Sequence, residues 1–413
     1  MKTRIKIGIL GISWSNIGSR TMARVIINEF SKRATKDKQE ISFKIFLDRR
    51  YTHRTSLLDD LDNQEQIFWR TGKIQFLKDL ILIFLYKVSS NDFFIDNSTN
   101  LKQISSCNFL IGANGYCFHN TNGIKSIIFS LSRPLFSFLL KKRVYLFPQS
   151  FGPFESKCRR FLYRFVFPKI DKIYVRGEES EENLSQIIER ELIICPDMAF
   201  LFDVPERYYQ KNRLNNKTDL KKIGIVPNIK LKKKDKNYID RLAELVSDMA
   251  NCDTCKIFLI PHEIKKGKFD DLSVCEQIYE SLNEEKKEKV ITIGNEKYSA
   301  YDYKAIIGQL DVVIASRFHS AVAALSQEVP TITLAWSFKY KELMSWFGLE
   351  NYNIDFNNFD VKKIDYLLEE IEKNDQAIKL STHRKLPDIA IRLECLFDQT
   401  YQKEKGLILS QKK

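Results

Sequence analysis

Apolar and polar positions along the chain follow two alternating patterns. Short runs of β-branched and other apolar residues are each followed by a segment in which apolar residues recur every three or four positions. The first pattern is typical of buried strands and the second of amphipathic helices, so the chain predicts an α/β fold of parallel strands joined by crossover helices. In the first half, strands are expected over Ile5–Leu10, Ser42–Leu47, Phe109–Ile111, Arg143–Phe147 and Lys172–Val175.

The alternation stops between Pro205 and Lys222, where the sequence is polar and has no period, as is typical of an interdomain linker. Beyond it, strands are expected over Ile223–Val226, Ile257–Ile260, Val290–Ile293, Val312–Ala315 and Thr331–Leu334, with helices over Tyr238–Ala250, Asp271–Leu282, Tyr303–Gln309, Ser320–Gln327 and Tyr340–Phe347. The sequence therefore predicts two Rossmann-like domains, residues 1–212 and 218–385, that face each other across a cleft. A C-terminal helix and basic tail are expected over residues 386–413.

The composition adds that the protein is ordered and basic. Of its 413 residues, 44% are hydrophobic and 29% are charged, which excludes a disordered or fibrous chain. The 66 Lys and Arg exceed the 53 Asp and Glu, so the net charge of +13 favours an anionic partner. Basic and aromatic residues are not interleaved along one strand or arm, so nucleic acid is not expected as that partner.

Cysteine usage and hydropathy indicate the cellular compartment that is expected for the protein. Only Cys252 and Cys255 form a C-x-x-C pair, and a zinc ribbon needs a second pair, so we expect reduced cysteines in a cytoplasmic protein and no metal. The start of the chain lacks the apolar core of a signal peptide, and Leu80–Tyr86 and Ile127–Leu140 are too short or too interrupted to span a bilayer. The apolar, basic segment Ile127–Arg143 is interpreted as a buried helix or, as an alternative, as a peripheral contact with the inner face of the cell membrane.

Ligands in open parallel sheets bind beside the carboxyl ends of the strands, so the turns after the strands are the candidate site. After the first strand, Asn16 and Gly18 lie in a turn of small residues through which backbone N–H groups can approach an anion. After the third, the sequence G-A-N-G places Asn114 in a similar turn, and His119 lies just beyond it. No residue near His119 in the sequence would orient it, so a structural role is favoured for that side chain.

Two further turns present polar side chains. The sequence P-Q-S-F-G-P over Pro148–Pro153 holds Gln149 and Ser150 in a rigid turn, which serves either a ligand or only the loop itself. Arg176 follows the strand Lys172–Val175 and precedes G-E-E-S. It would either pair with the acidic residues of the next helix or reach the cleft, and the sequence leaves both interpretations open.

The strongest group of candidate residues is S-R-F-H, which separates an apolar strand from a predicted helix. Arg317 offers a planar fork for carboxylate or phosphate, His319 can donate a proton near neutral pH, and Ser316 stands beside them as a ligand contact. Helix N-termini favour acidic residues, so basic ones here indicate an anion site. After the next strand come Trp336 and Lys339. They could bind a phosphorylated ligand or a sugar, or they could simply be a core tryptophan and a surface lysine, and the sequence favours neither interpretation.

In their order and spacing, these motifs resemble those of the polysaccharide pyruvyl transferases. The resemblance runs from Ile5 to about Leu349 and rests on P-Q-S-F-G-P, V-R-G-E-E-S, C-P-D-M-A-F at Cys195–Phe200, S-R-F-H-S-A-V-A-A and V-P-T-I-T-L. It implies a fold like that of GT-B glycosyltransferases, with an N-terminal acceptor side and a C-terminal donor side. It also implies phosphoenolpyruvate as donor, a glycan sugar as acceptor, anion-binding roles for Arg176 and Arg317, and His319 as the catalytic histidine. The first turn and G-A-N-G depart from the family's usual N-x-G-D and G-G-G.

The resulting hypothesis is an enzyme that adds a pyruvate ketal from phosphoenolpyruvate to a sugar of a cell-surface polysaccharide or of its lipid-linked precursor. His319 would be catalytic, and the substrate-binding residues would be Arg176, Arg317, Ser316, Asn16, Gln149, Ser150, Asn114 and Lys339. No metal or cofactor is expected beyond the donor itself. One alternative is a GT-B glycosyltransferase using a nucleotide sugar, since Glu342 and Glu350 stand eight apart, although Gly348 is expected to end the helix between them. A second alternative is a non-catalytic protein that binds acidic glycans.

Overall fold

The chain forms two compact units, each built around a parallel sheet. The computed structural model describes residues 4–13, 15–48, 65–69, 72–119, 123–214, 220–232, 234–264, 269–294 and 298–410. Unit 1 consists of Met1–Trp14, Met22–Met198 and Ile391–Lys413, and unit 2 of Ser15–Thr21 and Ala199–Ala390. The division thus falls at Ala199 rather than at residue 212, and the end of the C-terminal helix belongs to unit 1. Within the expected linker, Glu206–Lys211 is a helix, and residues 215–219 lie outside the described ranges.

Unit 1 contains a seven-stranded sheet in the order β3-β2-β1-β4-β5-β6-β7. Its strands are β1 (Ile5–Ile12), β2 (Ile41–Asp48), β3 (Glu65–Trp69), β4 (Phe109–Gly112), β5 (Arg143–Gln149), β6 (Lys172–Val175) and β7 (Ile193–Ile194). Neighbouring strands pair in parallel. Six of the eight residues of β1 are buried because helices cover both faces of the sheet, as the continuous apolar run of this strand predicts.

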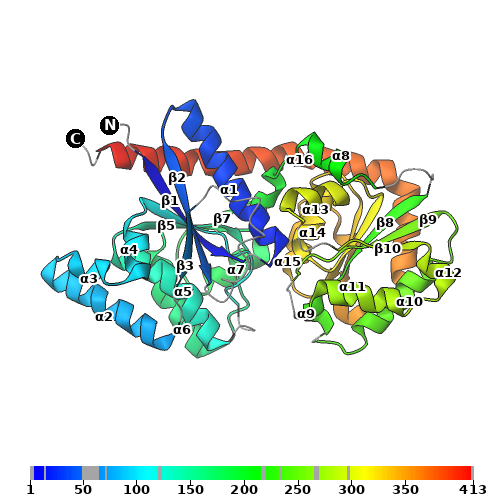
Figure 1. Cartoon of the computed structure of the whole chain (residues 1–413), viewed down its shortest axis with the longest axis horizontal. Helices are drawn as coiled ribbons and strands as arrows, with labels where there is room; N and C mark the ends of the chain where they lie inside the picture. The colour runs from blue at the N-terminus through cyan, green and yellow to red at the C-terminus, as the bar shows by residue number, and fades with distance from the viewer. Residues whose placement is uncertain are drawn as a thin grey trace. The chain divides into compact units, whose positions relative to one another are not determined.

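The helices of unit 1 form two layers (Figure 1). One layer contains α2 (Lys73–Ser89), α3 (Phe93–Asp96), α4 (Thr99–Ser105), α5 (Ile124–Leu139), α6 (Lys157–Val166) and α7 (Glu178–Ser185), with the short 3-10 turn Phe167–Lys169. The 3-10 turn Met198–Leu201 spans the division between the two units. The other layer contains α1 (Ile17–Lys36) and the end of α16 (Val361–Ser410). In that layer, Phe30 of α1 packs edge-on against Phe397 of α16, which in turn packs on Phe147 of β5.

Unit 2 repeats the architecture with six strands in the order β10-β9-β8-β11-β12-β13. They are β8 (Lys221–Val226), β9 (Cys255–Leu259), β10 (Val290–Thr292), β11 (Val312–Ala315), β12 (Thr331–Ala335) and β13 (Asn353–Asp355). The helices are α8 (Glu206–Lys211), α9 (Ile229–Lys232), α10 (Tyr238–Met249), α11 (Asp271–Glu280), α12 (Glu284–Lys287), α13 (Ala300–Ile307), α14 (Phe318–Leu325) and α15 (Lys339–Ser345), with 3-10 turns Glu350–Tyr352 and Phe356–Asn358 and the first part of α16.

The expected α/β class and all ten expected strands are confirmed, while β3, β7 and β13 were not expected. These three strands lie at sheet edges. β7 and β13 have only two and three residues, and β3 begins with the polar residues Glu65 and Gln66, so none of them gives a continuous apolar run. In both sheets the strand order reverses beside the first strand, which is the Rossmann-like order. Ligand crevices in such sheets open at this reversal, between β1 and β4 and between β8 and β11.

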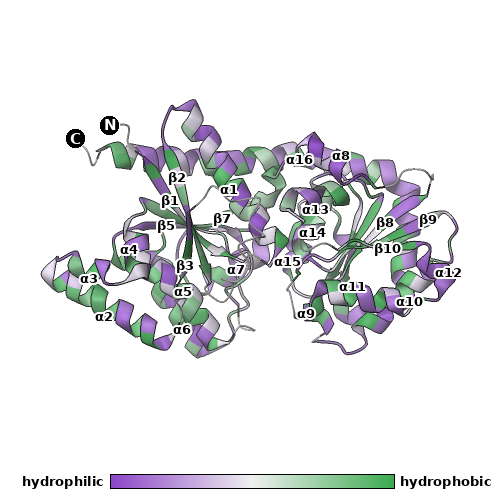
Figure 2. Cartoon of the chain, viewed as in Figure 1, coloured by the Kyte–Doolittle hydropathy of each residue, from purple (hydrophilic) through white to green (hydrophobic). Residues whose placement is uncertain are grey.

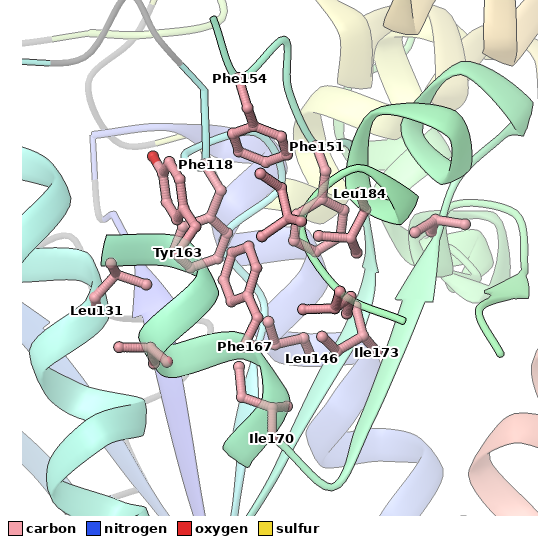
Figure 3. Close-up of a cluster of buried hydrophobic side chains, with 14 of the residues drawn as sticks. Phe118, Leu131, Leu146, Phe151, Phe154, Tyr163, Phe167, Ile170, Ile173 and Leu184 are labelled. Atoms are coloured by element: carbon pink, nitrogen blue, oxygen red, sulfur yellow. The ribbon is translucent and has the colours of Figure 1, made fainter. Parts of the chain in front are cut away.

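A buried cluster of aromatic residues fixes the P-Q-S-F-G-P turn in unit 1 (Figure 3). Phe151 and Phe154 reach into this cluster beside Phe118, Tyr163 and Phe167. The rings of Phe118 and Phe151 stack at 5.8 Å, and Phe167 meets both edge-on. Besides its two prolines, the turn is therefore held by the burial of Phe151 within it and of Phe154 directly after it.

Candidate functional site

The S-R-F-H sequence follows β11, at the reversal of strand order in unit 2. β8 and β11 are neighbours in the sheet, with Val226 paired to Ala315 at their carboxyl ends. Arg317 has extended backbone angles at the N-cap position, and α14 begins at the next residue. The turns that follow β8, β9 and β11 thereby meet at one edge of the sheet, which is where a ligand of this fold class binds.

His319 lies half-buried in the first turn of α14, against the first turn of α1, whose residues Ser15–Thr21 belong to unit 2. A Cβ atom placed on Gly18 would come within 2.2 Å of Cγ of His319, so only glycine permits this approach. On its other side, the imidazole ring of His262 runs nearly parallel to that of His319, with 6.4 Å between ring centres and 12° between planes.

His262 is a neutral imidazole enclosed by the site. It follows β9 and is 1% exposed, and neither ring nitrogen has a hydrogen-bond partner among the described residues. Burial holds the pKa of His262 well below its ordinary value, and the neighbouring charges of Arg317 and His319 lower it further. A buried imidazole without partners is unusual in a protein core and indicates a group that meets a ligand or water.

A cavity of about 10 Å³ lies between these rings and the first turn of α1. Its walls include Gly18, His262, Tyr303, Lys304 and His319. That volume holds roughly one water molecule, so a three-carbon substrate would have to lie outside it.

Arg317 is ion-paired with two carboxylates. Its Nη2 donates to Oδ1 of Asp271 over 2.6 Å and lies 3.1 Å from Oε2 of Glu263. Burial would lower the pKa of Arg317, but the two carboxylates outweigh that effect and raise it. The guanidinium is therefore permanently charged and largely compensated, whereas its Nε has no hydrogen-bond partner among the described residues. One donor of the fork remains for an anion.

The other sequence candidates in unit 2 have structural contacts of their own. Ser316 accepts a hydrogen bond from Tyr238 through its hydroxyl and from Asn228 and Tyr340 through its carbonyl, so it fixes the S-R-F-H turn. Lys339 is 8% exposed, and its ammonium lies 4.3 Å from the ring centre of Trp336. Asn16 caps α1 by accepting from the backbone N–H of Ser19. Substrate contacts of these three residues stay predictions.

Lys304 was not singled out in the sequence, yet its side chain is buried beside the cavity. It is 6% exposed, and Nζ donates to the carbonyl oxygen of Phe202 over 2.5 Å. Burial lowers the pKa of Lys304 to about 8. A buried ammonium of this kind opposes folding at neutral pH.

Replacement of Lys304 by methionine should therefore stabilise the protein at pH 7. The pKa of Lys304 is about 8 in the folded state and 10.5 in the unfolded state, so removing its charge should raise the free energy of unfolding by about 3 kcal/mol. Loss of the hydrogen bond to Phe202 should reduce this gain by about 1 kcal/mol. The unfolded state holds more protons between these two pKa values, so the gain is full below pH 8 and disappears as the pH rises to about 10.5. Calorimetry of Lys304→Met and of the exposed control Lys341→Met at pH 7, 9 and 10 checks this. An equal gain at all three pH values would contradict it.

In unit 1, Arg176 joins the motifs of the N-terminal half. It is 3% exposed and forms an ion pair with Asp197 of C-P-D-M-A-F. Its Nε donates to the carbonyl oxygen of Pro148 over 3.1 Å, and Nη1 to that of Gly115 over 3.4 Å. The sequence suggested either a local acidic partner or the cleft, and the structure adds Asp197, which lies after the next strand.

The remaining candidates of unit 1 gather around this arginine. Gln149 ends β5 fully buried, and both its amide atoms lack hydrogen-bond partners within the described part of the chain. The backbone N–H of Ser150 donates to Gly115. The side chain of Asn114 packs against Gly11, whose φ of +86° and lack of a Cβ allow that contact. A buried amide without partners is the clearest sign of a ligand contact in this unit.

His119 is buried against an aromatic ring from its own segment, and the structural role favoured for it stays a prediction. It is 6% exposed, and its ring stacks on that of Tyr116 at 4.2 Å. The hydroxyl of Tyr116 in turn donates to the carbonyl oxygen of Gly152. Glu342 and Glu350, considered for the nucleotide-sugar alternative, are on separate elements, because α15 ends at Ser345 and Gly348 has a positive φ of +69°.

Sequence reasoning missed His262, Glu263 and Asp271, which complete the surroundings of Arg317 and His319. The sequence P-H-E follows the expected strand Ile257–Ile260 directly, so the rule that directed attention to S-R-F-H would also have found His262. Asp271 starts α11 and gave no comparable signal, because acidic residues in the first turn of a helix are common.

Comparisons with solved structures find similar folds at low sequence identity. The UDP-GlcNAc 2-epimerase of Neisseria meningitidis, solved with UDP-GlcNAc, shares 12% identity at a TM-score of 0.60, with 97% of this chain and 100% of that one covered. A putative UDP-N-acetylglucosamine 2-epimerase of Listeria monocytogenes shares 11% at 0.57, covering 93% and 91%. The glycotransferase of kitacinnamycin shares 9% at 0.54, covering 97% and 98%. These likenesses show the fold alone, and they confirm the GT-B-like pair of Rossmann-like units.

Sequence comparison shows the family. No curated protein sequence matches this chain. The family model for polysaccharide pyruvyl transferase matches residues 39–338, which is more than half of the chain and includes P-Q-S-F-G-P, V-R-G-E-E-S and S-R-F-H. The chain therefore belongs to the polysaccharide pyruvyl transferase family.

Proposed function

We propose that this protein transfers the pyruvyl group of phosphoenolpyruvate to a sugar of a cell-surface polysaccharide or of its lipid-linked precursor, forming a ketal. The supporting observation is the position of His319, which lies at the reversal of strand order in unit 2 and beside the buried imidazole of His262. The family to which the chain belongs is named for the transfer of a pyruvyl group to a polysaccharide. An imidazole at such a place is suited to general acid catalysis near neutral pH.

The proposed reaction adds two sugar hydroxyls to one carbon of the donor. A proton from His319 goes to the methylene carbon of phosphoenolpyruvate, and the first sugar hydroxyl forms a C–O bond to the adjacent carbon as the double bond is lost. Phosphate then leaves with the C–O bonding electrons, and the second hydroxyl forms the other C–O bond of the ketal. The two hydroxyl protons replace the one that His319 gave and protonate the released phosphate.

The donor carries several negative charges and needs cationic partners. In unit 2, the Nε–H of Arg317 is proposed to bind the donor, with Lys339 and Ser316 nearby in the sequence motifs. Its charge is compensated by Asp271 and Glu263, so binding would be strengthened if the longer contact, to Glu263, opened. In unit 1, Arg176 and the buried amide of Gln149, with Ser150, Asn114 and Asn16 as further predicted contacts, are proposed to bind the substrates. No resident metal or cofactor is proposed.

The test is incubation of the full chain with phosphoenolpyruvate and a panel of sugar acceptors, following phosphate release together with the mass gain of a pyruvate ketal. We expect both with at least one acceptor. We also expect phosphoenolpyruvate, but not a nucleoside diphosphate, to raise the temperature of thermal unfolding. Stabilisation by UDP alone would instead support the nucleotide-sugar alternative. An acceptor attached to lipid would place the protein at the inner face of the cell membrane.

A further inference from the structure

Helix α2 turns an apolar face to solvent. Six large apolar side chains on it are exposed, from 37% for Leu85 to 87% for Ile74. The others are Leu77, Ile81, Phe84 and Val88. At about 100° per residue these six positions fall within an arc of roughly 100° on the helix, and the buried positions Asp79 and Ile83 lie on the opposite side. A surface helix normally has polar residues on that outward face.

The helix is firmly attached, so its exposed face is not a frayed end. The buried carboxylate of Asp79 accepts hydrogen bonds from Ser98, Asn100 and Gln75 over 2.6–2.8 Å. Ile83 is 2% exposed in the core that includes Trp69 and Phe136. The outward apolar stripe is therefore held in a fixed orientation.

The apolar surface continues over the neighbouring helices of the same layer. On α5, Ile124, Ile128 and Phe138 are 37–42% exposed, and on α6 Phe161 and Phe165 are 69% and 51% exposed. With the six on α2, these helices hold eleven of the eighteen large apolar side chains exposed in the described ranges. Figure 2 shows the apolar colouring along α2, α5 and α6 on one side of unit 1. We call these eleven residues, with the basic residues between them, the α2–α6 face.

The charges on this face have one sign. The basic residues are Lys73, Lys78 and Lys87 on α2, Lys125 on α5, and Lys157, Arg159, Arg160 and Arg164 on α6. The three helices are described throughout, and their one acidic residue is the buried Asp79. On α2, Lys73 and Lys78 flank the apolar stripe on its two sides. In the 3-10 turn that follows α6, the ammonium of Lys169 lies 3.9 Å from the ring centre of Phe165 of α6.

We propose that the α2–α6 face binds the anionic surface of a lipid bilayer, with its apolar side chains in the headgroup region and its basic side chains on lipid phosphates. Apolar residues bordered by Lys and Arg are the composition of interfacial helices, whereas two copies of this face would bring like charges together. Among the described residues, no helix combines the length and apolarity needed to cross a membrane, so the contact would be superficial. The membrane contact itself is inferred from the exposed residues of this face. Only the idea that the contact brings the enzyme to a lipid-linked acceptor rests on the proposed function.

The test is cosedimentation of the full chain with vesicles of phosphatidylcholine alone or mixed with phosphatidylglycerol, without donor or acceptor. Failure to bind would thus be distinct from failure of the transfer assay. We expect binding to the anionic vesicles, weakened by salt, and little binding to the neutral ones. Binding to neither, equal binding to both, or a dimer in place of binding would overturn the proposal.

Matched variants separate the two contributions. Leu77→Ser with Phe84→Ser should lower the vesicle partition coefficient about tenfold or more, and Lys78→Gln with Arg164→Gln about fivefold for each lost charge. The controls are Leu380→Ser with Ile391→Ser and Lys362→Gln with Lys363→Gln, which change exposed residues of α16. These should bind as the parent does. Equal losses in test and control variants would show that the face has no special role.

Discussion

Replacement of His319 by glutamine is expected to lower the rate of pyruvyl transfer by about 10²- to 10⁴-fold, the range that a positioned general acid contributes. Glutamine retains a polar side chain of similar reach but cannot deliver a proton near neutral pH. Because the His319 side chain is only half-buried and borders a cavity of about 10 Å³, a glutamine can take its place without displacing core residues, and we expect unit 2 to keep its fold. Phosphate release from phosphoenolpyruvate in the presence of an acceptor measures the effect.

The control for this experiment is the binding of the donor. Thermal stabilisation by phosphoenolpyruvate should persist in His319→Gln, because the anion is proposed to contact the arginines rather than the imidazole. A variant that transfers at the parent rate would remove His319 from the proton-transfer step. A variant that has lost both transfer and donor binding would instead assign His319 to donor recognition.

Gly18 gives a second way to reach the same imidazole without removing it. In Gly18→Ala, the new methyl carbon would lie 2.2 Å from Cγ of His319, so the ring must move. A displacement of about 1 Å can cost 10²-fold in rate, and we expect a loss of about that size. Gly406→Ala is the matched control, since both glycines lie in helices and a Cβ at Gly406 meets nothing within 4 Å. It should keep full activity.

The fold was predictable because a parallel sheet covered on both faces leaves a strong signal. Each central strand is a buried apolar run such as Ile5–Ile12, and each crossover helix adds a period of its own. The position of S-R-F-H in the fold was predictable for the same reason, since it directly follows the carboxyl end of the buried strand β11. Strand β3 and the division at Ala199 gave no such signal, because they depend on packing between segments far apart in the sequence.

The partners of the candidate residues were much less predictable. Asp197 beside Arg176 and Glu263 beside Arg317 follow other strands, Asp271 begins α11, and only the tertiary fold brings them to the arginines. The exposed stripe on α2 was not predictable either, since the apolar run Leu80–Tyr86 does not indicate in the sequence which side of the helix faces solvent. Charge compensation and exposure therefore had to come from the structure.

The buried ion pair of Arg176 leads to the largest stability effect that we expect. In Arg176→Met, the carboxylate of Asp197 would stay 2% exposed without its cation, and breaking such a pair costs about 3–5 kcal/mol of the free energy of unfolding. Asp197→Leu should cost a similar amount, because it leaves the guanidinium uncompensated. Scanning calorimetry of the full chain, with the exposed Lys373 to Glu369 pair broken by Lys373→Met as control, measures the difference. The control should lose at most about 1 kcal/mol.

The double variant Arg176→Met with Asp197→Leu shows whether compensation of charge is the cause. Removal of both charges should recover most of the loss, leaving about 1–2 kcal/mol for the carbonyl groups of Pro148 and Gly115 that lose their donor. Losses that simply add in the double variant would mean that the two residues act independently.

The same single variants also distinguish a structural role of Arg176 from a role in binding the donor. Asp197→Leu retains the guanidinium and should still bind phosphoenolpyruvate, whereas Arg176→Met should not if Arg176 contacts the donor. Equal donor affinity in both variants would restrict Arg176 to holding together the turns of unit 1.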